Sequence, residues 1–300
     1  MTPGPWGDGL ITGTGLRLEG VEFVYPGGVA ALDGIDLEVG PGDFVALMGS
    51  NGSGKSTLLK VITGLLEPTA GAVTVDGRRL TPQTFADIAP HVGYLFQDPN
   101  DQLFCATVAD DIAYGPENLG LLPEEVERRA YWAASVCGVE ELLSRPIHAL
   151  SYGQKKRVAL AGVLAMKPKI LVLDEPTASL DPMAEGSLMR LLRHLNLQGL
   201  TVLMATHDVD LIPLYADRVA LLRRGRLAVE GPLAEVFSQS KHLEGCDLRL
   251  PRISYLFDIF YSEDERPLTV GQARKALVRM VEQGRLDLVP ILMRDVSGGI

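Results

Sequence analysis

A short glycine-rich segment constrains the fold of this chain more than any other feature. It consists of Gly49, Ser50, Asn51, Gly52, Ser53, Gly54, Lys55, Ser56 and Thr57, and it fits the pattern G-x-x-x-x-G-K-[ST] of a phosphate-binding loop. Its glycines allow successive backbone N–H groups to point inward at a polyphosphate. The apolar residues 44–48 before it predict a buried strand, and residues 56–62 predict an apolar-striped helix. This context favours a true nucleotide-binding loop over a chance match.

The loop predicts which chemical groups hold the nucleotide. The helix that begins near Lys55 directs the positive end of its dipole toward the same anion. Lys55 is expected to reach the β- and γ-phosphates, and the hydroxyl of Ser56 is expected to ligate Mg²⁺. The segment therefore predicts a nucleotide and Mg²⁺ as its ligands.

The bulk properties exclude several classes of protein. The chain has 300 residues, which allow one large domain or two unequal ones, and a formal net charge of −10, which disfavours nucleic acid as a partner. No apolar run reaches the roughly 18–20 residues needed to span a bilayer. Residues 1–15 lack the basic and apolar parts of a secretory signal and are expected to form a flexible tail. Three scattered cysteines favour a reducing cytosol over a disulfide framework.

The organisation along the chain predicts an α/β protein with two additions. Residues 16–40 alternate apolar and polar side chains and predict an antiparallel β-subdomain, whereas strands and helices alternate from residue 44 onward and predict a mostly parallel, doubly wound sheet. Residues 98–166 carry little strand signal and predict a helical insert. We expect a main domain over residues 16–240 and a small α/β or helical extension over residues 241–300.

A second segment supplies the acids that a nucleotide hydrolase needs. Residues 170–173 form a fully apolar strand, and Asp174 and Glu175 follow it. Ligands of open α/β sheets bind at this carboxyl edge. Asp174 is expected to hold Mg²⁺ through water, and Glu175 is expected to orient the attacking water or accept its proton. The alternative is that two acids simply end a strand at the surface.

A capped helix begins near residue 151 and allows two interpretations. Ser151 is a plausible N-cap, and Gln154 occupies the partner position of a capping box. Ser151, Gly153 and the free N–H groups of the first turn also make an anion site, with Gln154 beside them. The segment by itself favours the purely structural interpretation.

Three single residues also allow a structural and a functional interpretation. His207 follows the strand 201–205, which is expected to lie beside the strand that ends at Asp174, so the imidazole could approach a γ-phosphate. Tyr25 is an ordinary turn aromatic or stacks on an adenine ring. Gln97 is a plain loop residue or a contact of Mg²⁺ and the attacking water.

Taken together, these segments resemble the ATPase subunits of ABC transporters, which are P-loop NTPases. That family carries an aromatic loop, Walker A, Q-loop, signature, Walker B, D-loop and H-loop in this order. In this chain the corresponding positions are Tyr25, residues 49–57, Gln97, residues 150–154, residues 170–175, residues 179–181 and His207. The resemblance covers about residues 16–235. Tyr152 departs from the commonest signature, which has glycine there, although Ser151 and Gly153 are retained.

A narrower resemblance is to the ATPase subunits of energy-coupling-factor importers. Residues 96–104, 151–158, 250–253 and 267–270 carry it, and residues 211–218 lean toward the cobalt or nickel branch. The resemblance implies that two ATPase subunits, identical or different, sandwich each ATP between Walker A of one and the signature of the other. It also implies a position on the cytoplasmic face of the cell membrane, with a coupling helix of an integral membrane partner in a groove near Gln97, Asp110 and Asp111. Vitamin importers share most of these features and stay open as an alternative.

Two other classes of function compete with the transporter interpretation. Soluble ABC ATPases that repair DNA carry long coiled coils between Walker A and the signature, and only about 93 residues separate Thr57 from Leu150 here. Translation factors of the family join two ATPase domains in one chain, and this chain has one. A regulatory module that binds nucleotide without hydrolysis would not need Glu175 and His207. Residues 241–300 are expected to add a dimer contact.

Overall fold

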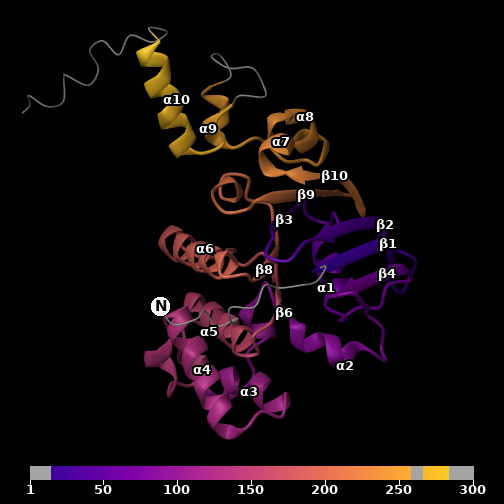
Figure 1. Cartoon of the computed structure of the whole chain (residues 1–300), viewed down its shortest axis with the longest axis vertical. Helices are drawn as coiled ribbons and strands as arrows, with labels where there is room; N and C mark the ends of the chain where they lie inside the picture. Colours follow the sequence, from indigo (N-terminus) through magenta and orange to yellow (C-terminus); the bar gives the residue numbers. More distant parts are fainter. Residues whose placement is uncertain (1–14, 258–265, 284–300) are drawn as a thin grey trace, which may run out of the picture.

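A six-stranded, mostly parallel sheet forms the centre of the computed structural model, which describes residues 15–257 and 266–283 (Figure 1). In spatial order its strands are β10 (Arg226–Pro232), β9 (Arg218–Arg223), β3 (Phe44–Met48), β8 (Thr201–Thr206), β7 (Ile170–Asp174) and β6 (Val92–Leu95). All neighbours pair in parallel except β10, which pairs antiparallel with β9 at the edge. The predicted α/β class and the predicted parallel sheet are confirmed.

Strict alternation along the strands gives this sheet two buried faces. In β3, Val45 and Leu47 belong to one hydrophobic cluster, whereas Phe44, Ala46 and Met48 belong to another. The first cluster includes α1 (Lys55–Ile62), which starts at the end of the phosphate-binding loop. The second cluster includes the helices of the insert. Burial of both faces explains why β3 and residues 170–173 of β7 are fully apolar.

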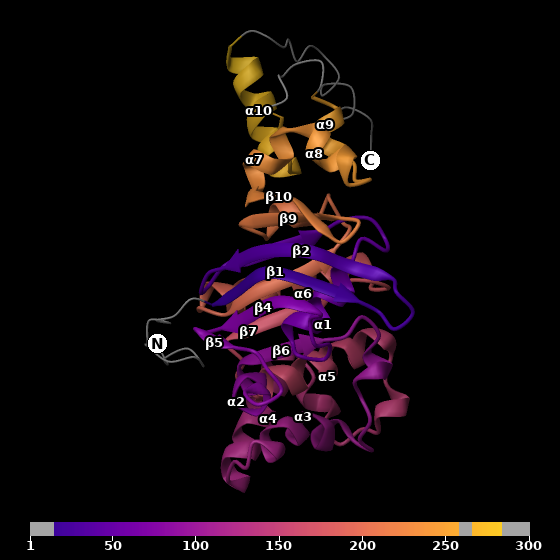
Figure 2. The same ribbon diagram turned by 90° about the vertical axis from the view of Figure 1, so that its right-hand side faces the viewer.

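A separate antiparallel sheet covers the face that carries α1 (Figure 2). Its strands, in spatial order, are β2 (Ala30–Val39), β1 (Leu16–Val24), β4 (Ala70–Val75) and β5 (Arg78–Arg79). Buried and exposed residues alternate along β1, as expected for a sheet with one solvated face. The predicted antiparallel region is confirmed.

The predicted helical insert lies between β6 and β7. Its helices are α3 (Val108–Asn118), α4 (Pro123–Cys137) and α5 (Tyr152–Ala165). Pro123 opens α4, and Gly138 ends it with a φ of 65°, a left-handed conformation that glycine adopts without strain. The predicted apolar stripe of α4 is buried. The other helices of the main body are α2 (Phe85–Ile88), before β6, and α6 (Pro182–Leu197), after β7.

The described part of the C-terminal extension is helical. It contains α8 (Ser240–Gly245), α9 (Arg252–Tyr255) and α10 (Val270–Glu282), and α7 (Leu233–Ser238) precedes it. These helices lie at the opposite end of the molecule from α3 and α4 (Figure 1). Leu243 and Cys246 belong to the cluster on the central sheet, so this segment packs on the main body. None of the helices within residues 15–257 and 266–283 has the length and apolarity to cross a membrane.

Two sequence expectations about the chain ends need comment. The predicted flexible tail lies outside the described residues except for Gly15, which is buried and accepts a hydrogen bond from the backbone of Asp76. Thr269 caps α10 as predicted, accepting from Gln272 N. Residues 269–272 fit the pattern of a full capping box, but that prediction is wrong. The side chain of Gln272 accepts from the backbone N–H of Leu268 and not from that of Thr269. Residues 284–300 of the predicted extension also lie outside the described residues.

Candidate nucleotide-binding site

The phosphate-binding loop has the backbone that its glycines predict. Gly52 and Gly54 have φ values of 78° and 109°, and a Cβ atom added to Gly54 would lie 2.7 Å from the carbonyl oxygen of Ala31. The Nζ of Lys55 donates to the carbonyl oxygens of Gly49 at 2.8 Å and Ser50 at 3.1 Å. Burial lowers the pKa of Lys55, and the nearby acids oppose that shift. The ammonium group is thus held inside the loop, where a polyphosphate would meet it.

Asp174 joins this loop to the central sheet. The Ser56 hydroxyl donates to its Oδ1 at 3.1 Å, and the Tyr94 hydroxyl donates to its Oδ2 at 3.2 Å. Tyr94 lies in β6, beside β7, which ends in Asp174. Burial, together with the charge of Asp174, raises the pKa of Tyr94, so its hydroxyl stays a donor. The hydroxyl oxygens of Ser56 and Tyr94 therefore lie beside the carboxylate of Asp174, next to the phosphate-binding loop.

Glu175 and His207 face each other at the carboxyl edge of the sheet. β7 and β8 pair in parallel, with Asp174 opposite Ala205, which confirms the predicted adjacency of these strands. The Nδ1 of His207 lies 3.0 Å from each carboxylate oxygen of Glu175. The Glu175 side chain is nearly enclosed, whereas that of His207 is largely exposed. The carboxylate thus fixes one ring nitrogen and leaves the other toward solvent.

A buried lysine holds the backbone of Glu175. The Nζ of Lys156 donates to the carbonyl oxygens of Glu175 at 3.0 Å and Pro176 at 2.8 Å. Only 2% of Lys156 is exposed, and burial lowers its pKa to about 8. Glu175 has a φ of 46°, a left-handed conformation that is strained for a residue with a Cβ atom. Lys156 lies on α5, so the insert contacts the acidic strand end directly.

A cleft of about 360 Å³ brings most of the predicted residues together. Among the residues that line it are Tyr25, Asn51, Gly52, Gly54, Lys55, Ser56, Thr57, Gln97 and Glu175. The hydroxyl of Tyr25 lies 3.0 Å from Thr57 Oγ1, and its ring packs edge-on against Phe23 at 4.9 Å between centroids. The lining of the cleft therefore combines an aromatic ring, a cation and an acid.

The signature segment lies elsewhere. Ser151 N donates to Gln154 Oε1 at 2.9 Å and Gln154 N donates to Ser151 Oγ at 3.3 Å, so the predicted capping box is confirmed. Ser151, Gly153 and Gln154 line a separate hollow of about 540 Å³ with Arg157 and Asp181. This hollow shares no lining residue with the cleft. A single copy of the chain does not bring the signature to its own phosphate-binding loop.

Comparisons with known proteins agree with this geometry. Residues 32–178 match the family model described as ABC transporter. An energy-coupling factor transporter ATP-binding protein of Methanocaldococcus jannaschii is 44% identical over 267 residues, spanning 87% of this chain and 96% of the relative. The chain belongs to this family of ABC transporter ATP-binding proteins. A relative of the same name from Methanosphaera stadtmanae is 44% identical over 271 residues, with 88% and 98% covered. The chain is thus an ABC ATPase, an enzyme that hydrolyses ATP.

Solved structures place this ABC ATPase among known cassettes. CbiO1 from Clostridium perfringens, described as part of the ABC transporter complex CbiONQ, has a TM-score of 0.71 and 40% identity, covering 82% of this chain and 99% of that one. The cassette MJ0796, in a dimeric post-hydrolysis state bound to ADP and Pi, has a TM-score of 0.67 and 31% identity, covering 73% and 98%. The fold and its ATP-binding character are therefore those of the family.

Sequence reasoning missed two residues of the ABC ATPase site. Tyr94 lies in a short apolar strand, and its link to Asp174 arises only from the pairing of β6 with β7. Lys156 follows the signature in a basic run that resembles a solvated helix face, but the structure buries it against Glu175. A usable signal was its position two residues before the apolar run 158–161, with only Arg157 between them.

Proposed function

We propose that two ATPase subunits, each built like this chain, close head to tail around ATP. Each nucleotide would lie between the cleft of one subunit and the Ser151 hollow of the other. The separation of these two hollows within one copy supports this arrangement, as does the dimeric form of the related cassette MJ0796. ATP that binds the closed pair better than the open one shifts the equilibrium between them by its differential affinity.

Within one subunit, the residues of the cleft divide the work of binding. Lys55 contacts the β- and γ-phosphates, and Tyr25 stacks on the adenine ring. The oxygen atoms of Ser56 and Asp174, 3.1 Å apart, fit the preference of Mg²⁺ for hard oxygen ligands, and the Gln97 amide lies in the same region. Mg²⁺ bound there supplies charge neutralisation of the phosphates.

Glu175 and His207 carry the hydrolytic step. The carboxylate of Glu175 orients the attacking water and accepts its proton, while its bond to Nδ1 fixes the His207 ring. The other ring nitrogen, Nε2, then contacts an oxygen of the γ-phosphate. The convergence of Ser56, Asp174, Glu175 and His207 at one sheet edge is the observation that carries this assignment.

The proposed role is to power a membrane importer of the energy-coupling-factor type, from the cytoplasmic face of the membrane. A largely apolar groove of about 480 Å³, lined by Phe104, Asp111 and Tyr114 among others, supports docking of a helix from an integral membrane partner. The groove differs in detail from the expected one. Asp110 lines a different hollow on α3, and Gln97 lines the nucleotide cleft.

The proposed cargo is cobalt or nickel ions, and vitamin import is the alternative. The resemblance of residues 211–218 to the metal branch supports the metals, as does the 40% identity to CbiO1. Uptake of radioactive cobalt and nickel would be compared in cells with and without the gene, alongside vitamin uptake. Loss of vitamin uptake alone would transfer the proposal to the vitamin branch.

Two substitutions test the assignment of the nucleotide site. Lys55→Ala should abolish tight ATP binding, because it removes the cation inside the loop. Glu175→Gln should keep ATP binding and lower turnover by about two orders of magnitude or more. Lys60→Ala, on the same helix as Lys55, serves as the control. Binding is measured by calorimetry and turnover by phosphate release; a Glu175→Gln protein with normal turnover would remove Glu175 from the catalytic role.

A further inference from the structure

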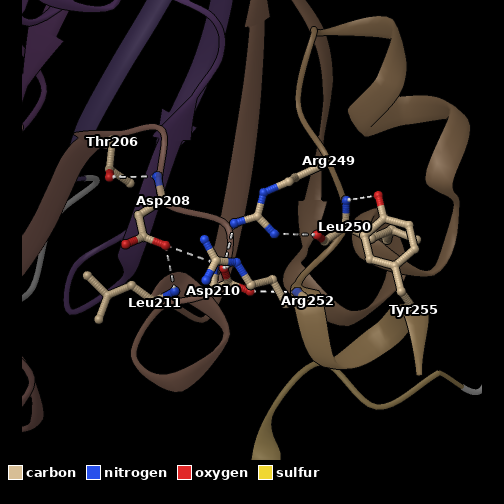
Figure 3. Close-up of polar contacts among 8 residues, drawn as sticks. All are labelled: Thr206, Asp208, Asp210, Leu211, Arg249, Leu250, Arg252 and Tyr255. Atoms are coloured by element: carbon tan, nitrogen blue, oxygen red, sulfur yellow. Dashed lines mark hydrogen bonds and ion pairs between the residues drawn. The ribbon is translucent and has the colours of Figure 1, made fainter. Parts of the chain in front are cut away.

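The C-terminal extension grips the loop that carries His207 (Figure 3). Arg249 Nη2 lies 2.6 Å from Asp210 Oδ2, and the backbone N–H of Arg252 donates to Asp210 Oδ1 at 2.6 Å. The guanidinium Nε of Arg252 lies 3.6 Å from the same carboxylate. We name residues 247–252 the strap. The carboxylate of Asp210 is therefore held by two residues of the strap, Arg249 and Arg252.

Hydrogen bonds within the loop 206–211 connect Asp210 to the residues on either side of His207. Asp208 Oδ1 accepts from the backbone N–H groups of Asp210 at 2.9 Å and Leu211 at 3.1 Å. The backbone N–H of Asp208 donates to Thr206 Oγ1 at 3.1 Å, at the end of β8. His207 lies between these two bonded residues. Its backbone is thus fixed on one side by the sheet and on the other by a turn whose residue Asp210 contacts the strap.

The strap is itself anchored, and it reaches a second loop of the site. Leu250 is buried in the cluster that also contains Val209, and its backbone N–H donates to the Tyr255 hydroxyl at 3.3 Å. Asp247 Oδ2 lies 3.5 Å from the hydroxyl of Ser50 in the phosphate-binding loop. The same short segment therefore touches both the loop that binds phosphate and the loop that carries His207.

We propose that the strap positions His207 for ATP hydrolysis, with Asp210 and Arg249 as positioning residues; this inference rests on the proposed role of His207. A half-exposed ion pair adds little stability, but charge-assisted bonds fix geometry. Small misplacements of a reacting group lower rates far more than they lower stability. The strap would thereby make turnover depend on the state of the C-terminal extension.

The first test separates turnover from binding. Arg249→Ala should lower kcat for Mg-ATP roughly three- to tenfold, and the Kd for a non-hydrolysable ATP analogue should change less than twofold. Lys169→Ala is the matched control, because Lys169 is as exposed as Arg249 (45% and 44% of the side chain) and pairs with Asp76 away from the cleft. Asp210→Asn, which keeps the side-chain shape, repeats the test should Arg249→Ala fold poorly.

The second test observes His207 directly. In full-length protein labelled on histidine rings, Arg249→Ala and Asp210→Asn should shift or broaden the NMR signals of His207, assigned with His207→Gln, whereas Lys169→Ala should leave them unchanged. Unchanged His207 signals, or a kcat within twofold of the unmodified protein, would overturn the proposal. Failure of the proposed ATPase site is distinguished separately, since it would appear as normal turnover in Glu175→Gln whatever the His207 signals show.

Discussion

At the scale of single residues, the backbone of Glu175 is the point of greatest interest. Its φ of 46° lies in a region that a residue with a Cβ atom avoids, and such conformations persist only where the surroundings hold them. Lys156 supplies that hold through two carbonyl oxygens, those of Glu175 and Pro176. The position of the carboxylate therefore depends on a side chain from the helical insert.

The ionisation of Lys156 makes a prediction about stability. Burial lowers its pKa from 10.5 to about 8, so between these pH values the unfolded chain binds one more proton than the native one. The free energy of unfolding should then rise with pH across this window, relative to Lys156→Met, by up to about 3 kcal/mol at about 1.4 kcal/mol per pKa unit. Urea unfolding of both proteins at about pH 7.5, just below the window, and at about pH 10, near its upper end, measures the difference.

Comparison with the Met variant removes the titration of every other group from this measurement. A difference between the two proteins that stays constant with pH would mean that Lys156 keeps its ordinary pKa in the native state. Such a result would contradict the burial of its side chain as the dominant influence on its pKa.

At the scale of elements, the contact between β6 and α5 decides how the insert meets the sheet. A Cβ atom added to Gly93 would lie 2.4 Å from Val163 Cγ1 and 3.1 Å from Pro168. Gly93→Ala should therefore push α5 from the sheet and lower the free energy of unfolding by about 1–3 kcal/mol. Gly245→Ala is the control, since nothing lies within 4 Å of a Cβ atom there. Equal unfolding midpoints in urea would contradict the prediction.

Alanine variants at the N-caps of α3 and α5 distinguish a structural from a functional role of Ser151. Ser151 caps α5 and Thr107 caps α3, and each side chain accepts a backbone N–H. Both alanine variants should lose about 1 kcal/mol of stability. Only Ser151→Ala should also weaken ATP-dependent dimerisation, measured by light scattering with Glu175→Gln in the background. Equal dimerisation of the two variants would leave Ser151 with a capping role alone.

How far the sequence predicts these elements depends on whether the signal is local. The apolar strand over residues 170–173 and the capping box at Ser151 are each encoded within a few residues, and both are confirmed. The contacts of Lys156 with Glu175 and of Asp210 with Arg249 join residues 19 and 39 positions apart. Such contacts follow from packing between elements, which periodicity in one chain does not reveal.

At the scale of the whole molecule, the separation of the cleft from the Ser151 hollow makes activity depend on concentration. Because the proposed site is completed by a second subunit, the ATPase rate of the isolated chain should rise with roughly the second power of protein concentration where dimers are scarce. Phosphate release measured over about a hundredfold range of protein concentration checks this expectation. Strict proportionality over that range would argue for a site complete in one copy.

The bond between α5 and the end of β7 has a mechanical consequence for an assembled pair. The start of α5 presents Ser151 outward, and one turn further along the same helix Lys156 holds the main chain of Glu175. In the proposed dimer, a displacement of Ser151 by the neighbour's bound ATP would therefore move Lys156 and, through it, the main chain of Glu175 in the other nucleotide site. Hydrolysis at the two nucleotide sites of the dimer would then be coupled through its two α5 helices.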